Sequence, residues 1–262
     1  MIFKRFAANL RAQNWLAIGI ELGIVVVGVF IGTWVANWNQ ERAEKAKTHR
    51  AIVQMKPVLD QLTTYFRSSR NYYAVARAYA ATAIAGWRGD PRISDRDFVI
   101  GAYQASQIDA LGINGATFSS ILGADELRNI DDPELRADVA TLMSADYTQI
   151  DLPSIDTPYR RNVRRIIPVE IQEAIRARCG DRGLPNDPTT IVLPSTCDAT
   201  ISPSQAAKAA ALLRAHPDLL DDLQFHLAAL ATLLGNVTAF EPTVKRIEAK
   251  RQELGGRQDA GR

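Results

Sequence analysis

The chain has little of what catalytic and metal sites are usually built from. It contains two cysteines and three histidines, and His49, His216 and His226 are scattered, without metal-ligand spacing. The sequence has no nucleophile elbow, phosphate-binding loop, HExxH motif or dinucleotide fingerprint. Adjacent carboxylates such as Asp131 and Asp132 point apart on a helix, so they do not form an acid–base pair. We therefore expect no catalytic residue, no metal ion and no cofactor.

Strong charge and strand-like patterns are also scarce. The formal net charge is only +2, so no global field favours nucleic acid or an acidic partner. Hydrophobic residues make up 47% of the chain, yet few runs alternate or cluster as β-strands do. We expect an all-α protein that does not bind nucleic acid.

One long apolar run is the least ordinary feature that is present. Between Trp15 and Trp38 the only ionisable side chain is Glu21. A hydrocarbon core of roughly 30 Å needs about 20 helical residues, so the run is long enough to cross a bilayer. Its tryptophans, including Trp34, stand at the two ends, where indoles prefer the headgroup level. Because the run is long for a signal peptide and no small-x-small cleavage site follows it, we predict an uncleaved transmembrane helix over residues 15–38.

Lysines and arginines are nearly balanced on the two sides of this predicted helix, so they do not indicate its orientation in the membrane. The two cysteines give that indication instead. Cys179 and Cys197 end a loop, CGDRGLPNDPTTIVLPSTC, that is rich in Gly, Pro and Asp. A disulfide suits such a loop and persists in oxidising compartments; two unrelated reduced thiols are the alternative. We predict the disulfide. With it we predict a single-pass protein of the bacterial inner membrane, with a cytosolic N-terminus and a periplasmic C-terminal domain.

Glu21 lies on the same face of the predicted helix as Gly28, with Gly32 beside it, whereas Gly19 and Gly23 lie roughly opposite. Small residues let two helix backbones approach, and a polar group on that face can bond to a partner. Three interpretations of Glu21 stay open. It reaches back to the cytosolic headgroups, it is protonated and bonds within a homo-oligomer or to a membrane-protein partner, or it moves protons beside a channel partner.

Residues 12–42, AQNWLAIGIELGIVVVGVFIGTWVANWNQER, resemble the first part of an uncharacterised family of bacterial single-span membrane proteins of unknown function. The shared features are a short basic N-terminus, NW before the span, IVVVGVFIG within it and VANWN after it. Residues 116–139, ATFSSILGADELRNIDDPELRADV, are similar to a second recurring stretch, in which a small-residue turn leads into an Asp-Pro-Glu-Leu helix start. The resemblance implies a membrane anchor followed by a helical region, and no catalytic residues.

The rest of the chain divides into three parts. Residues 1–14 are basic with apolar positions at helical spacing, which predicts a cytosolic amphipathic helix on anionic lipid; a frayed end is the alternative. Residues 39–254 are enough for a single core and should form an extracytoplasmic α-helical domain. Residues 255–262 should be a flexible tail.

A seven-residue repeat predicts a long helix that continues from the span. Pro57 should kink this helix rather than stop it, because the repeat keeps its phase on both sides. Apolar residues spaced three and four apart over 220–237 predict a C-terminal helix, perturbed at Pro242, that packs antiparallel on the first. The repeat residues are Ile52, Leu59, Phe66 and Tyr73, a coiled-coil-like pattern.

Shorter helices should lie at the far end of this helical hairpin. Capping signals predict helix starts near Ser94, at Asp131 or Asp132, and at Ser202. Residues 159–179 should form one helix bent near Pro168, followed by the disulfide-closed loop with a short extended piece at 191–193. Residues 109–117 read as a loop.

Arg160, Arg161, Arg164 and Arg165 form the one basic cluster. Such a run is usually a solvated helix face; the alternative is an anion-binding patch for a ligand or partner. His226 lies beside the leucine pattern and reads as a helix-surface or core-edge residue.

These features favour a non-enzymatic, membrane-anchored interaction or scaffold protein. Its partners would be membrane lipid and, through the transmembrane helix, a second copy or another membrane protein. The alternative is an accessory subunit of an ion- or proton-coupled membrane complex that uses Glu21. A ligand-sensing domain is a third class, which would need a partner to carry its signal.

Overall fold

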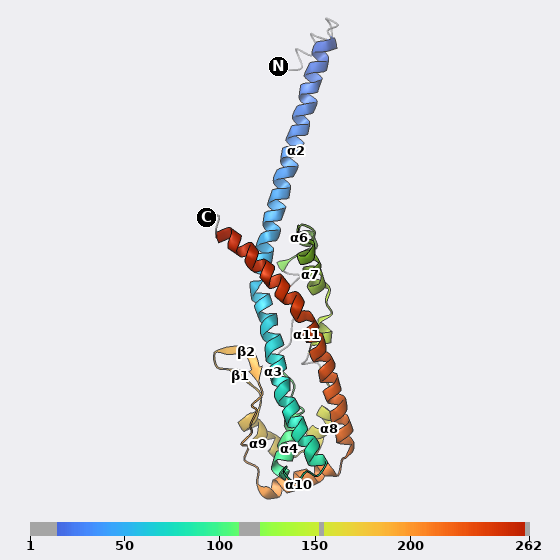
Figure 1. Ribbon diagram of the computed structural model, residues 1–262, viewed down its shortest axis with the longest axis vertical. Helices are drawn as coiled ribbons and strands as arrows, with labels where there is room; N and C mark the ends of the chain where they lie inside the picture. The colour runs from blue at the N-terminus through green and yellow to red at the C-terminus, as the bar shows by residue number, and fades with distance from the viewer. Residues whose placement is uncertain (1–14, 110–120, 152–154, 260–262) are drawn as a thin grey trace.

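The computed structural model describes residues 15–109, 121–151 and 155–259 (Figure 1). The predicted amphipathic helix over 1–14 and nearly all of the predicted loop over 109–117 lie outside these ranges. The fold is all-α with one small β-hairpin, in agreement with the predicted class. Its elements are α2 (Trp15–Gln54), α3 (Lys56–Trp87), α4 (Asp95–Gln104), α6 (Ala124–Arg128), α7 (Pro133–Ser144), the 3₁₀ helix η1 (Tyr147–Ile150), α8 (Pro158–Ile166), α9 (Val169–Cys179), β1 (Arg182–Leu184), β2 (Asp187–Val192), α10 (Pro203–Arg214) and α11 (Asp218–Asp259).

Helices α2 and α3 form a nearly continuous rod along the whole molecule (Figure 1). The helical pattern is interrupted at Met55 alone, whose amide donates to the Ile52 carbonyl at 3.1 Å. Pro57 has no N–H to donate, so the backbone ladder loses a bond here while the flanking residues stay helical. The predicted repeat faces the interior, because Ile52, Leu59, Phe66 and Tyr73 are all buried.

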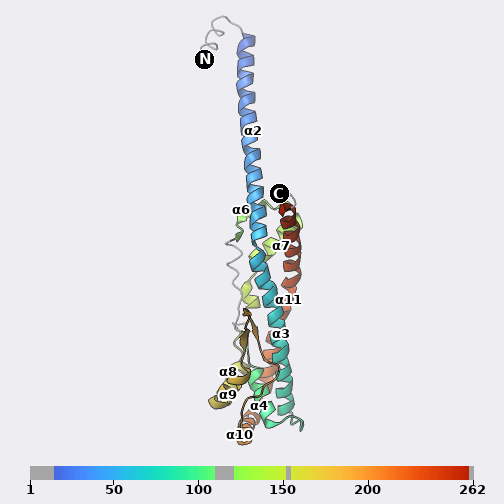
Figure 2. The same ribbon diagram turned by 90° about the vertical axis from the view of Figure 1, so that its left-hand side faces the viewer.

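Helix α11 returns along α3 towards the middle of the rod (Figures 1 and 2). Leu223, Leu230 and Val237 recur every seven residues in α11 and are buried. Because α11 packs along α3, the predicted antiparallel pair is confirmed. The helix continues through Pro242 and ends at Asp259. Residues 255–259, which we predicted to be part of a flexible tail, are therefore the last turns of this helix.

Two hydrophobic clusters lie one beyond the other along the rod. The first joins the end of α2 and the first half of α3 to α7 and the second half of α11. The second joins the end of α3 to α4, α8, α9, α10 and the start of α11. Tyr79 packs against both clusters. The apolar part of α2 before Thr48 belongs to neither cluster.

The three predicted helix starts are confirmed by side-chain caps. Ser94 accepts a hydrogen bond from the Asp97 amide at the start of α4. Asp132 accepts from the amides of Glu134 and Leu135 at the start of α7, and Ser202 accepts from Gln205 at the start of α10. Each cap satisfies amides that have no partner inside the helix, which is why these residues mark the helix ends.

One local prediction needs correction, and one is confirmed. Residues 159–179 form two helices, α8 and α9, rather than one bent helix, because Ile167 is extended with ψ 125°. A residue before proline is disfavoured in the helical region, so Pro168 ends α8 instead of bending it. An extended piece was predicted at 191–193, and Ile191 and Val192 are the end of β2, which pairs antiparallel with β1 through Arg182 and Val192. Strand β1 was not predicted because it is short and exposed.

Candidate functional site

The first part of α2 is apolar and stands outside both clusters. A window in it has a mean hydropathy of 2.2 with none of its residues buried, which is long and apolar enough to cross a membrane. Leu16, Phe30 and Trp34 are 77%, 71% and 68% exposed. A soluble helix rarely exposes so long a run of apolar side chains, because each costs free energy in water. We call residues 16–38 the apolar segment.

The predicted contact face of the apolar segment is open on this chain. A Cβ added at Gly28 or Gly32 would meet nothing within 4 Å, and the same holds for Gly19 and Gly23. The structure of one chain therefore leaves both glycine faces available. Glu21 is partly exposed, and its Oε2 has no hydrogen-bond partner among the residues that the structure describes.

The end of the apolar segment carries an aromatic and cationic stack that we did not predict. The Trp34 and Trp38 rings are parallel within 3°, with centroids 6.5 Å apart. The Arg42 guanidinium carbon lies 4.2 Å from the centre of the Trp38 ring. The spacing of four residues puts all three side chains on one helix face, so the sequence contained this signal.

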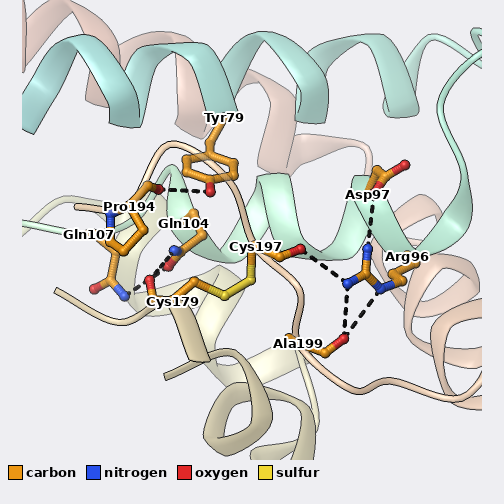
Figure 3. The surroundings of a disulfide bond; sticks show 9 residues. All are labelled: Tyr79, Arg96, Asp97, Gln104, Gln107, Cys179, Pro194, Cys197 and Ala199. Carbon is orange, nitrogen blue, oxygen red and sulfur yellow. Dashed lines mark hydrogen bonds and ion pairs between the residues drawn. A yellow bond between two sulfur atoms is a disulfide. The ribbon is translucent and has the colours of Figure 1, made fainter. Parts of the chain in front are cut away.

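The predicted disulfide is confirmed and joins the end of α9 to the segment before α10. The Cα atoms of Cys179 and Cys197 are 5.3 Å apart, and Cys179 is buried in the second cluster. The Gln104 side chain donates to the Cys179 carbonyl at 2.6 Å. Arg96 donates to the carbonyls of Cys197 and Ala199, at 3.1 and 3.0 Å (Figure 3). The backbone on both sides of the bridge is thus fixed by α4.

The four arginines of α8 do not make a single solvent-facing patch. Arg160 donates to the Ser106 carbonyl at 2.6 Å. Arg164 donates to Gln107 Oε1 at 2.8 Å, and its guanidinium lies 5.2 Å from the centre of the Tyr103 ring. Burial lowers the pKa of Arg164, and the positive charge of Arg160 adds to this effect. These two arginines therefore hold the segment after α4.

The other two arginines, Arg161 and Arg165, are exposed. Arg161 forms an ion pair with Asp156 at 2.6 Å. Residues four apart share a helix face, and neighbours differ by about 100°, so the cluster divides into an inner and an outer pair. The four side chains therefore do not share one helix face, and anion binding by this cluster stays a prediction.

His226 is wholly buried, whereas we predicted a surface or core-edge position. Its Nδ1 lies 2.7 Å from Thr157 Oγ1, and its ring centre lies 5.6 Å from that of Tyr159. Burial lowers the pKa of His226 to about 4, and the charge of Arg160 contributes. The sequence did contain a signal for this burial, because His226 lies three residues after Leu223, on the buried face of α11.

Within residues 15–109, 121–151 and 155–259, no three histidine, cysteine, aspartate or glutamate side chains are grouped so that they could hold a metal ion. Comparisons with known proteins gave no match to any family model, curated protein or solved structure.

Proposed function

We propose that this chain is a single-pass membrane protein of the bacterial inner membrane, whose extracytoplasmic helical domain binds or scaffolds another component without catalysis. The observation that carries the proposal is a change of environment within one helix. Residues 22–47 of α2 are exposed, and burial begins at Thr48 in the same helix. A bilayer would cover the first part, as the protein core covers the second.

A single crossing is favoured by the environment of α11. This helix also contains a window of sufficient length, but its mean hydropathy is 1.3 and 22% of that window is buried. Leu223, Leu230 and Val237 are core residues. Burial in the protein accounts for its apolar content, so α11 needs no membrane.

The disulfide supports the orientation. Disulfides persist in oxidising compartments, which favours a position outside the cytosol for the domain that carries Cys179 and Cys197. The N-terminus then lies on the cytosolic side, since the proposed span crosses once.

Two reporters fused after Arg262 test this topology. Alkaline phosphatase, which needs its own disulfides, should be active there, and green fluorescent protein exported in the unfolded state should be dark. The same reporters fused before Met1 should give the opposite pair of results, which provides the control. A fluorescent C-terminal fusion, or a mature chain that begins after Asn39, would reject the proposal.

The alternative role, an accessory subunit of an ion- or proton-coupled complex, rests on Glu21. It is the one ionisable side chain of the apolar segment, and its Oε2 has no described partner. Affinity purification of the intact chain from native membranes separates the two roles. A multi-span channel partner whose ion flux is lost with Glu21→Gln supports the alternative. Co-purification that survives Glu21→Gln supports the scaffold role.

A further inference from the structure

The stack of Trp34, Trp38 and Arg42 lies where the apolar segment ends and the charged part of α2 begins. Trp38 is the last residue of the apolar segment, and the residues that follow it, NQER, are all polar. Helix α2 runs through this boundary without interruption. All three side chains of the stack are exposed, so they are open to whatever surrounds the end of the apolar segment.

The direction of the Arg42 side chain gives its charge a defined height along the helix. At 1.5 Å per residue, the Cα atom of Arg42 lies about 6 Å beyond that of Trp38. The guanidinium carbon, however, lies 4.2 Å from the centre of the Trp38 ring. The side chain therefore folds back towards the apolar segment, and its charge lies level with an indole of the kind that prefers the headgroup layer.

The lysines that follow the stack are neutralised by the domain, whereas Arg42 is not. Lys45 forms an ion pair with Asp131 at 3.0 Å, and Lys47 forms one with Glu126 at 2.5 Å. Within the described residues, the Arg42 guanidinium contacts the Trp38 ring and has no carboxylate at ion-pair distance. Its positive charge is thus available to an anion from outside the chain.

The two acids of the same stretch, Glu41 and Glu44, do not take this place. Successive helical residues differ by about 100°, so both carboxylates point to other faces of α2 than Arg42 does. Glu44 instead accepts a hydrogen bond from the Gln40 side chain at 3.0 Å. The face of the stack therefore carries aromatic rings and a positive charge without a nearby acid of its own helix.

A guanidinium that lies on an aromatic ring keeps its hydrogen-bond donors free. The contact with the ring uses the flat face of the cation, and the five N–H groups lie in its plane and point outward from the edge. Two of these donors match two oxygens of a phosphate group, and such charge-assisted bonds are the stronger kind. The contact with Trp38 also holds the guanidinium in one place, which reduces the entropy that binding costs.

We propose that Arg42, held by Trp38, binds the phosphate group of a phospholipid in the leaflet nearest the domain. The inference rests on the proposed membrane location and adds to it the lipid group that the chain binds. The acyl chains of the lipid pack along the apolar segment beside Trp34. The phosphate is common to charged and zwitterionic phospholipids, so a net charge on the lipid is not required. The contact fixes the depth of the span in the bilayer.

Two lipids with equal acyl chains and no net charge test the recognition of phosphate. They are phosphatidylethanolamine and glucosyl diacylglycerol, and native mass spectrometry of the intact chain in detergent measures the binding of the first lipid molecule. We expect the phospholipid to bind at least about threefold tighter than the glycolipid. Equal binding, or tighter binding of the glycolipid, overturns the proposal.

Inorganic phosphate distinguishes a lipid from a free anion. In molar excess it should not displace the phospholipid, because the acyl chains add apolar contacts that phosphate lacks. Displacement would assign the site to free phosphate and overturn the proposal.

Three variants locate the binding. Arg42→Gln and Trp38→Leu should each reduce the preference for the phospholipid by at least about threefold, because one removes the charge and the other removes the ring that holds it. Arg50→Gln changes another exposed arginine of α2 and should keep the preference of the unaltered chain. Helicity and the melting temperature establish that each variant is folded. A preference that survives Arg42→Gln means that the phosphate is bound elsewhere, and the proposal fails.

Extraction of native membranes with alkaline carbonate separates this inference from the proposed membrane location. The unaltered chain and Arg42→Gln should both stay in the membrane pellet, because the apolar segment is the same in both. Release of the unaltered chain rejects the membrane location and this inference with it. Retention of both chains with equal lipid preference rejects this inference alone.

Discussion

His226 makes the stability of the domain depend on acid at the scale of a single residue. Its pKa falls from 6.5 to about 4 because burial disfavours the charged ring. Between these two values the unfolded chain binds a proton that the folded protein does not. The free energy of unfolding should therefore decrease as the pH falls from about 6.5 to about 4, by about 3 kcal/mol in all.

Thermal unfolding of the intact chain in detergent, followed by circular dichroism at pH 7 and pH 5, measures this decrease. His226→Gln should be less stable at pH 7 but should lose less on acidification. His216→Gln, at an exposed position, should behave as the unaltered chain does. An unchanged pH dependence in His226→Gln would assign the acid sensitivity to other groups.

Arg164 and Arg165 are neighbours in the sequence, but their substitution should reduce stability by different amounts. Arg164→Gln removes hydrogen bonds to Ser106 and Gln107 and should cost about 2 kcal/mol of unfolding free energy, as is usual for bonds from a charged group. Arg165→Gln changes an exposed side chain and should cost less than about 0.5 kcal/mol. Denaturant unfolding of both variants is the measurement. Equal losses would mean that the inward contacts of Arg164 add nothing to stability.

At the scale of elements, the disulfide ties the end of α9 to the segment between β2 and α10. It closes a loop with a sequence separation of 18, for which the loss of unfolded-state entropy corresponds to about 3 kcal/mol. A reducing agent should lower the melting temperature of the intact chain, and the doubly substituted chain Cys179→Ala, Cys197→Ala should melt at the lower temperature with or without reductant. A reductant effect that persists in this double variant would have another origin.

The two glycine faces of the apolar segment differ only in the side chain that accompanies them. If Gly28 and Glu21 form a contact face, Gly28→Leu should reduce cross-linked oligomers or partner complexes in native membranes severalfold, because Leu prevents close backbone approach. Gly19→Leu, on the opposite face, is the matched control and should have little effect. Equal results for the two substitutions would remove the reason for assigning the contact to the Glu21 face.

The elements that the sequence predicted are those whose signals are local. The repeat of Ile52 and Leu59 shows which side of the α2–α3 rod is buried, and Ser94 and Ser202 mark helix starts through caps formed within three residues. Strand β1 and the separation of α8 from α9 were missed, since a three-residue strand has no periodicity and the effect of Pro168 depends on Ile167.

At the scale of the whole molecule, the sites were harder to predict than the fold. The burial of His226 depends on α8, and the directions of Arg160 and Arg164 depend on the segment after α4. Local spacing determines helices, but these sites come from contacts between residues far apart in the chain.

The α2–α3 rod reaches from the apolar segment to the far end of the domain with its single interruption inside the core. In the proposed membrane setting, residues 38 to 48 hold the domain about 15 Å above the bilayer surface, at 1.5 Å per residue. The two helices are interrupted at Met55 alone, so in that setting a tilt of the span would carry the domain with it. A change of about 10° in the inclination of the span sweeps Trp87 sideways by about 13 Å, which turns a small rearrangement among lipids into a large displacement of the distal end.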